Sequence, residues 1–353
     1  MELLDYLRRA VKDQASDLFL VAGGPVCEKL DNRLVPVSEG RVFPRETEAL
    51  IMELYALAGR EPAPYLQRGD DDFSLSVPEL ARFRVNAYRQ RGSLAAVVRI
   101  VSFEIPDWRA CGIPEQVMAL SDMLHGMVLV TGTAGSGKST TQACVIDQIN
   151  RNRECHIITL EDPIEYLHRD VRSIVSQREI AIDTENYLSA LRACLRQAPD
   201  VILLGEMRDA ETIHTAMTAA ETGHLLIATL HTRGAVNTID RIIDSFPAGQ
   251  QEQIRAQLSM VLDTVVSQQL LPGKDEKLVP AFEIMRMNSA IRGLIRDNKT
   301  HQINNAIAAG AREGMMTMDQ SILALYREGK ISAETAVSFA SNADQMKRWM
   351  TSG

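Results

Sequence analysis

The sequence lacks features that would direct the protein into a membrane or an oxidising compartment. No apolar run approaches the length of a membrane span. The opening residues, MELLDYLRRAVKDQ, have the apolar spacing of a helix and carry acids at Glu2 and Asp5, unlike a secretory signal. The five cysteines are an odd number without a C-x-x-C pair, which fits neither a disulfide framework nor a thiolate zinc knuckle. We therefore expect a cytoplasmic protein with no direct membrane insertion.

Positive charge is also scarce. The 38 lysines and arginines are outnumbered by 46 acids, giving a net charge of -8 and no sequence-wide attraction for phosphodiester backbones. No tract combines basic and aromatic residues as single-strand binders do. A local basic groove or channel stays compatible with this composition, but nucleic acid is not an expected partner.

The pattern of the sequence changes along the chain, and its 353 residues are enough for two or three domains. Short strand-like runs mix with an opening helix at first, and Pro and Gly then mark a linker. Short apolar runs that alternate with amphipathic stretches follow, and they predict a buried, mostly parallel sheet with helical crossovers. The predicted parts are a small α+β domain at 1–104, a hinge at 105–126, an α/β core at 127–272 and a helical region at 273–353.

A phosphate-binding loop is the strongest local signal. The segment GTAGSGKS at 132–139 follows an apolar strand and precedes a helix-compatible run, which is the context that a P-loop requires. Its glycines let backbone N–H groups converge on phosphate, Lys138 reaches the β and γ oxygens, and Ser139 ligates Mg²⁺. A Gly-rich turn with an incidental lysine is the alternative, which these flanks disfavour. The expected nucleotide-binding residues here are Gly132, Thr133, Ala134, Gly135, Ser136, Gly137, Lys138, Ser139 and Thr140.

Polar side chains follow three further apolar strands. EDPIE at 161–165 and Gly205-Glu206 each end a strand, and such carboxylates can hold Mg²⁺ and orient water at the edge of a parallel sheet. Glu165 is the candidate for polarising water. His231 ends the third strand, where a histidine is usually structural but can also sense phosphate.

With these segments assembled, the sequence resembles the secretion ATPase superfamily and, within it, the PilT-type retraction motors of type IV pili. The resemblance covers nearly the whole chain. The segments that carry it include ASDLFL, ARFRVNAYRQRG, the P-loop, ITLEDPIEY, LRACLRQAPDVILLGEMRDAET, TGHLLIATLHT and AIRGLIRD. The implied fold is a RecA-like core with a small PAS-like N-terminal domain before it and C-terminal helices after it.

The resemblance also implies roles for single residues. Glu161, Asp162 and Glu165 would form an Asp box with Glu165 as the catalytic carboxylate, Glu206 would be the Walker B glutamate that helps to hold the metal, and His224 and His231 would form a His box. Arginines would neutralise the γ-phosphoryl group or contact a neighbouring subunit, although any one of them could instead form a surface ion pair. They are Arg82, Arg84, Arg99, Arg192, Arg196 and Arg208.

Departures from the pattern leave the phosphate ligands intact. Thr133-Ala134 replaces the usual Pro-Thr, Phe19 replaces a His, and Gly293 replaces an Asn. Extension motors typically carry an additional N-terminal domain and a four-cysteine zinc motif, whereas no cysteine follows Cys194. The resemblance therefore implies a retraction motor or its accessory relative.

The implied mechanism is a homohexamer that binds ATP and Mg²⁺ and turns an inner-membrane pilus platform protein, at the inner face of the cell membrane at the pilus base. A second pilus ATPase is a further candidate partner. Two other classes stay open at this point: an ATP-dependent regulatory binding protein with negligible turnover, and a nucleic-acid translocase, which the acidic composition disfavours.

Overall fold

The chain divides into two compact units. The computed structural model describes residues 2–30, 33–101, 104–275 and 277–351. The first unit contains Met1–Glu104 with Glu165–Leu167, and the second contains Ile105–Ile164 with His168–Gly353.

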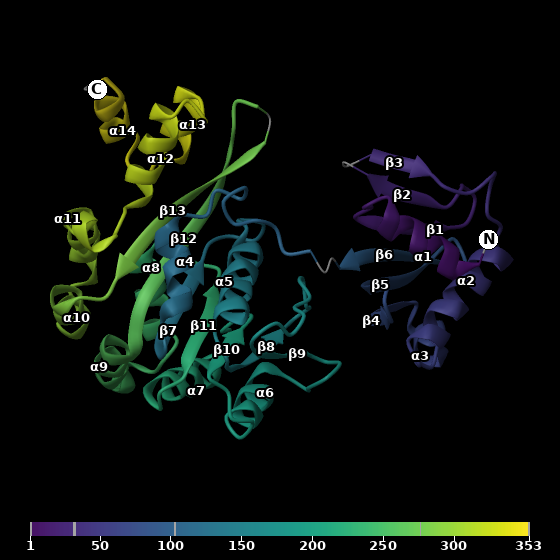
Figure 1. The fold of residues 1–353 in the computed structure, drawn as a ribbon, viewed down its shortest axis with the longest axis horizontal. Coiled ribbons are helices and arrows are strands. Elements are labelled where there is room, and N and C mark those ends of the chain that lie inside the picture. The colour runs from purple at the N-terminus through teal and green to yellow at the C-terminus, as the bar shows by residue number, and fades with distance from the viewer. Residues whose placement is uncertain (1, 31–32, 102–103, 276, 352–353) are drawn as a thin grey trace. The chain divides into compact units, whose positions relative to one another are not determined.

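An antiparallel sheet with helices forms the first unit (Figure 1). Over the described residues its strand order is β3-β2-β1-β6-β5-β4. The strands are β1 (Asp17–Val21), β2 (Cys27–Leu30), β3 (Arg33–Pro36), β4 (Asp70–Val77), β5 (Ala81–Gln90) and β6 (Ser93–Val101). The helices are α1 (Leu3–Lys12), α2 (Pro44–Leu57) and α3 (Ala63–Arg68).

Alternation explains how this sheet places its side chains. Along β5, Phe83 and Val85 are fully buried, while Arg82 and Arg84, which alternate with them, are half-buried. Successive strand residues point to opposite faces of the sheet. The buried face packs on helices such as α1, whose Leu3 is also buried. This architecture agrees with the predicted small α+β domain.

A larger sheet organises the second unit. Within the described residues its order is β13-β12-β7-β11-β10-β8-β9, and only the β12–β13 pair is antiparallel. The strands are β7 (Gly126–Thr131), β8 (His156–Glu161), β9 (Ile174–Glu179), β10 (Val201–Leu204), β11 (Leu225–Leu230), β12 (Leu262–Pro272) and β13 (Leu278–Arg286). The mostly parallel sheet agrees with the predicted α/β core.

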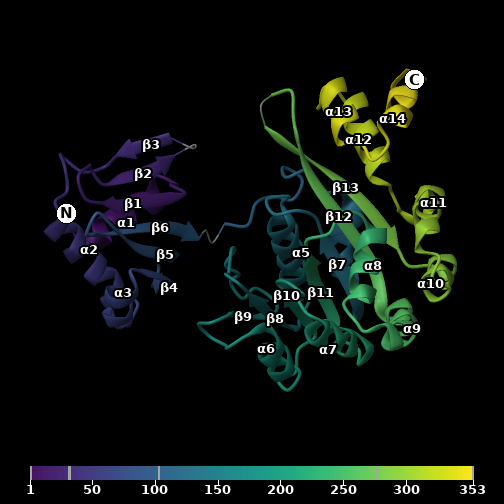
Figure 2. The same cartoon turned by 180° about the vertical axis from the view of Figure 1, so that it is seen from behind.

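Helices cover both faces of this sheet, as Figures 1 and 2 show from opposite sides. The α-helices are α4 (Glu115–Met118), α5 (Lys138–Asn152), α6 (Tyr187–Cys194), α7 (Ala210–Glu221), α8 (Ala235–Asp244), α9 (Gln251–Val261), α10 (Ser289–Arg296), α11 (Ile303–Ala309), α12 (Met318–Arg327), α13 (Ala333–Phe339) and α14 (Ala343–Thr351). Short 3-10 helices are η1 (Ala119–Asp122), η2 (Ala248–Gln250), η3 (Thr300–Gln302) and η4 (Ala311–Glu313).

Burial on both faces accounts for the continuous apolar runs of the strands. Val128 of β7 packs on the face that α4 and α5 cover, whereas Leu129 packs on the face that α6 to α11 cover. A parallel strand between two helical layers has no solvent side, so it needs no polar alternation.

Two stretches differ from their predicted character. The predicted hinge at 105–126 contains α4 and η1, and its buried Val117 and Leu120 join the core of the second unit. The predicted helical region at 273–353 also contributes β13 to the sheet, because Leu278–Arg286 pairs with β12. Both segments carry apolar residues that are buried only through contacts distant in sequence.

The C-terminal helices begin where their capping signals stand. Thr317 and Gln320 form the predicted capping box of α12, and Ser332 accepts a hydrogen bond from the N–H of Thr335 at the start of α13. Together with α14 these helices pack around Leu271 and Ala281 at one end of the β12–β13 hairpin (Figure 1). Among the described helices, none has the length and apolar character needed to cross a membrane.

A buried acid lies in the first unit. The side chain of Glu28 on β2 is fully buried, and neither carboxylate oxygen has a hydrogen-bond partner in the described part of the chain. The guanidinium Nε of Arg9 lies 4.0 Å from Glu28 Oε1. Burial raises the pKa of Glu28, Asp13 adds to the rise, and Arg9 opposes it.

A raised pKa in the folded state means that ionising Glu28 destabilises this unit, so stability is lost as pH rises above the ordinary value of 4.5. We expect Glu28→Gln to raise the Tm at pH 8 by about 2–4 °C, the size of a single-interaction change, and to leave it nearly unchanged at pH 4. Thermal unfolding across this range is the measurement. The exposed Glu39→Gln is the control, and a gain independent of pH would contradict the assignment.

Candidate active site

The P-loop at 132–139 joins the end of β7 to the start of α5. Gly132 and Gly137 both have positive φ angles, of 145° and 88°. A Cβ on Gly132 would lie 2.4 Å from the carbonyl oxygen of Gln268, and one on Gly137 would lie 2.7 Å from Gln268 Nε2. Neither end of the loop therefore tolerates a side chain, whereas a Cβ on Gly135 meets nothing within 4 Å.

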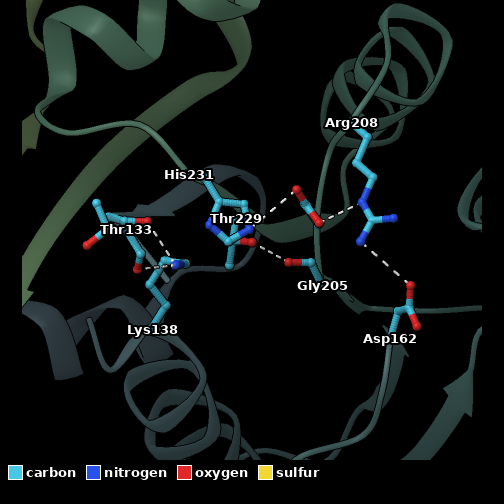
Figure 3. Close-up of polar contacts among 9 residues, drawn as sticks. Thr133, Lys138, Asp162, Gly205, Arg208, Thr229 and His231 are labelled. Atoms are coloured by element: carbon cyan, nitrogen blue, oxygen red, sulfur yellow. Dashed lines mark hydrogen bonds and ion pairs between the residues drawn. The ribbon is translucent and has the colours of Figure 1, made fainter. Parts of the chain in front are cut away.

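Lys138 is held on the inner side of this loop. Its Nζ donates hydrogen bonds of 2.9 Å to the carbonyl oxygens of Gly132 and Thr133, and the residue is only 8% exposed (Figure 3). The buried ammonium thus remains at the position from which a phosphate-binding lysine acts.

The surroundings of the loop suit an anion. α5 is a long helix that begins directly after the loop, and the positive N-terminal end of its dipole favours an anion there. Ser136 Oγ is buried and has no hydrogen-bond partner within the described ranges. Ser139, in the first turn of α5, is half-buried and supplies a hydroxyl that suits Mg²⁺.

Sheet order gathers the other polar groups. β11 lies next to β7, β10 next to β11, and β8 next to β10, all parallel, so the residues that follow these strands share one edge. Figure 3 shows Asp162, Arg208 and His231 of the resulting cluster, together with Gly205, which directly precedes Glu206 in the sequence. The structure thereby brings together Glu206, His231 and Asp162.

Ion pairs and hydrogen bonds fix the Glu206 carboxylate. Arg208 Nε donates to Glu206 Oε2 at 2.7 Å, and His231 Nε2 lies 3.4 Å from Oε1, forming an ion pair when the imidazole is protonated. The Arg208 guanidinium also lies 3.7 Å from Asp162 Oδ2. Glu161 accepts hydrogen bonds from Thr159 and Gln177.

Steric crowding explains why residue 205 is a glycine. A Cβ at this position would lie 2.8 Å from the hydroxyl of Tyr187 and 3.0 Å from the carbonyl oxygen of Leu160. Thr229 Oγ1 donates a hydrogen bond to the Gly205 carbonyl oxygen. The position before Glu206 therefore has no room for the Asp that the generic Walker B pattern places there.

Tyr187 is a site residue that the sequence did not indicate. Burial raises the pKa of its phenol, and the charges of Asp162, Glu206 and Glu161 contribute, while Arg208 opposes them. The phenol therefore stays protonated beside the carboxylates. Tyr187 is the first residue of α6 and belongs to no sequence motif that would have identified it as a site residue.

His224 and His231 lie at opposite ends of β11. His231 follows the strand and joins the carboxylate cluster, whereas His224 precedes it. The Nδ1 atom of His224 lies 2.9 Å from the carbonyl oxygen of Ala219 in α7. His224 thus pairs with the C-terminal end of a helix and is separated from the cluster by the length of the strand.

The remaining predicted arginines have partners elsewhere. Arg192 pairs with Glu211 at 2.6 Å, and Arg196 donates to the carbonyl oxygen of Arg192. On the N-terminal sheet, Arg84 lies opposite Arg99 in register, and Arg82 lies two residues before Arg84 on the same face of β5. Arg82 donates a hydrogen bond to Ser76, Arg84 pairs with Asp72, and Arg99 pairs with Asp17.

Glu165 is exposed and belongs to the segment 165–167, which clusters with the first unit. Among the described residues it makes no hydrogen bond or ion pair. Its catalytic role stays a prediction.

Comparison with known proteins places this site in a family. The sequence profile described as type II/IV secretion system protein matches residues 3–350. The chain belongs to this family. A twitching motility protein of Neisseria gonorrhoeae is 47% identical over 80% of this chain and 76% of its own length. The type IV pilus retraction ATPase PilT of Pseudomonas aeruginosa is 41% identical over 95% of this chain and 97% of its own.

A solved structure agrees with these relatives. The crystal structure of the pilus retraction motor PilT with bound ADP is 42% identical, covers 99% of both chains and has a TM-score of 0.90. The predicted resemblance to PilT-type ATPases and the predicted fold class are confirmed. The chain is a nucleotide-binding ATPase of this type.

Removing the Lys138 ammonium should abolish most turnover, because this group neutralises phosphate charge inside the loop. We expect Lys138→Ala to lower kcat/KM for ATP by at least about 100-fold. Phosphate release from the purified full chain is the measurement. Lys330→Ala, which removes an exposed ammonium paired with Glu328, is the matched control. Native turnover in the Lys138→Ala protein would show that the P-loop lysine has no part in ATP hydrolysis.

Proposed function

We propose that the chain is a motor ATPase that drives retraction of a type IV pilus. The observation that carries this proposal is the group of polar residues at one sheet edge: a P-loop with Lys138 inside it, and a Glu206 carboxylate bonded to Arg208 with His231 beside it. The extent of the likeness to the retraction ATPase of Pseudomonas aeruginosa, nearly the full length of both chains, supports it.

In the proposed reaction, bound MgATP supplies a phosphoanhydride whose terminal phosphoryl group passes to water. Lys138 and the first-turn N–H groups of α5 bind and neutralise the phosphates. Ser139 and Glu206 would hold Mg²⁺, an ion that takes oxygen ligands and keeps several waters. Glu165 would orient the attacking water and accept its proton.

Arginines would complete the site. Arg208 already fixes Glu206 and Asp162, while Arg82, Arg84 and Arg99 form a basic strip on one face of the N-terminal sheet. We assign this strip to nucleotide phosphates, and Arg192 and Arg196 to γ-phosphoryl contacts from a neighbouring subunit of a homohexamer. Arg192 and its partner Glu211 are both more than half exposed, so this ion pair can be exchanged for a phosphate contact.

The proposed work is done at the pilus base. Hydrolysis would change the angle between the two units, and the ring would turn an inner-membrane platform protein from its cytoplasmic side. A second pilus ATPase would be a partner if this chain is the accessory member of a pair.

Two carboxylates can be separated by kinetics. We expect Glu165→Gln to lower kcat by about 100-fold with little change in KM, because a general base acts on the chemical step. Glu206→Gln should also raise the Mg²⁺ concentration that gives half-maximal rate. The exposed Glu185→Gln serves as control, with titrations of ATP and Mg²⁺ as the measurement. A wild-type kcat in Glu165→Gln would mean that another group acts as the general base.

The direction of pilus movement can be read in cells. We expect a strain that lacks this gene to keep or accumulate surface pili and to lose twitching, and a Lys138→Ala copy not to restore movement. Pilus counts by microscopy and colony spreading are the measurements, with the wild-type copy as control. Bald cells would indicate extension instead. Restoration by Lys138→Ala would indicate a regulatory binding protein, or an accessory motor whose partner hydrolyses ATP.

A further inference from the structure

Gln268 of β12 is a buried polar residue beside the P-loop. It is only 3% exposed. β12 runs parallel to β7, with Ser267 paired to Thr131, so Gln268 lies alongside the point where β7 ends and the loop begins. The sequence gives no sign of this placement, since Gln268 lies 127 residues after Thr141, the residue that it contacts just beyond the loop.

This one residue touches the loop at three places. Its main-chain carbonyl oxygen lies 2.4 Å from the position that a Cβ of Gly132 would take, and its side-chain Nε2 lies 2.7 Å from that of Gly137. Its Oε1 accepts a 2.8 Å hydrogen bond from Thr141 Oγ1 in the first turn of α5. Gln268 therefore contacts the beginning of the loop, its end and the helix that follows.

We propose that Gln268 is a positioning residue for ATP hydrolysis, which holds the P-loop and the start of α5 in the geometry that binds phosphate. The amide is neutral, so it can support the loop without competing with phosphate for the Lys138 ammonium. The Thr141 hydroxyl is fully buried, and a buried hydroxyl without its partner keeps the full penalty of leaving water. The hydrogen bond therefore resists displacement of the helix start.

The neighbouring residue extends the support to the carboxylate cluster. Ser267 Oγ accepts a 2.9 Å hydrogen bond from the N–H of Gly234, in the short loop that follows His231. Adjacent residues of β12 thus contact the two loops whose residues act on the nucleotide. Small displacements of a catalytic group cost rate even when binding survives, so a fixed spacing between these loops favours turnover.

The test replaces the amide while keeping side-chain length. We expect Gln268→Met to fold and to lower kcat about tenfold, with KM for ATP changed less than about threefold, because the loop loses its lateral support. Gln269→Met, the next residue on the same strand and on its other face, is the matched control and should keep wild-type kcat. Phosphate release, measured on the folded full chain, gives both constants.

Thr141→Val removes the same hydrogen bond from the helix side and keeps the proposal testable if Gln268→Met does not fold. We expect it to lower kcat similarly, and the double variant to lose no more than either single variant. Two outcomes overturn the proposal. One is a lower Tm with wild-type kcat per folded chain, which marks a structural role. The other is additive losses in the double variant. Both readouts are independent of pilus movement.

Discussion

The site depends on the order of parallel strands in the second sheet. Because β7, β11, β10 and β8 are neighbours and run the same way, their carboxyl ends meet at one edge. The P-loop, His231, Glu206 and Asp162 each follow one of these strands, so four segments far apart in sequence reach the same place. Burial of both faces under helices fixes the strands, and residues that follow fixed strands are placed more precisely than residues on free loops.

Close packing then limits which residues can stand at this edge. Gln268 occupies the space beside Gly132 and Gly137, and Tyr187 occupies the space beside Gly205. The side chain of Gln268 explains the glycine at 137, its main-chain carbonyl oxygen explains the glycine at 132, and the Tyr187 side chain explains the glycine at 205. A methyl group at any of the three would have to move a main-chain atom or a buried polar group, which is costly in an interior packed at native density.

The sequence predicted the features that local patterns specify. The P-loop and the α12 cap at Thr317 depend on residues a few positions apart, and both lie where they were expected. Tyr187 and Gln268 could not be predicted because they reach the site through tertiary packing alone. His224 was grouped with His231 through resemblance, yet the length of the β11 strand separates them. Register and packing, which no short motif encodes, account for these differences.

The electrostatic arrangement indicates why a nucleotide can enter with little rearrangement. Lys138 is bonded to two neutral carbonyl oxygens, and exchange of these for phosphate oxygens pairs the ammonium with acceptors of opposite charge, which form stronger bonds. Glu206 is already held by Arg208, so its carboxylate does not have to be ordered when a metal arrives. Groups placed before binding lower the reorganisation energy of the reaction, which is the largest contribution that a fixed site makes to phosphoryl transfer.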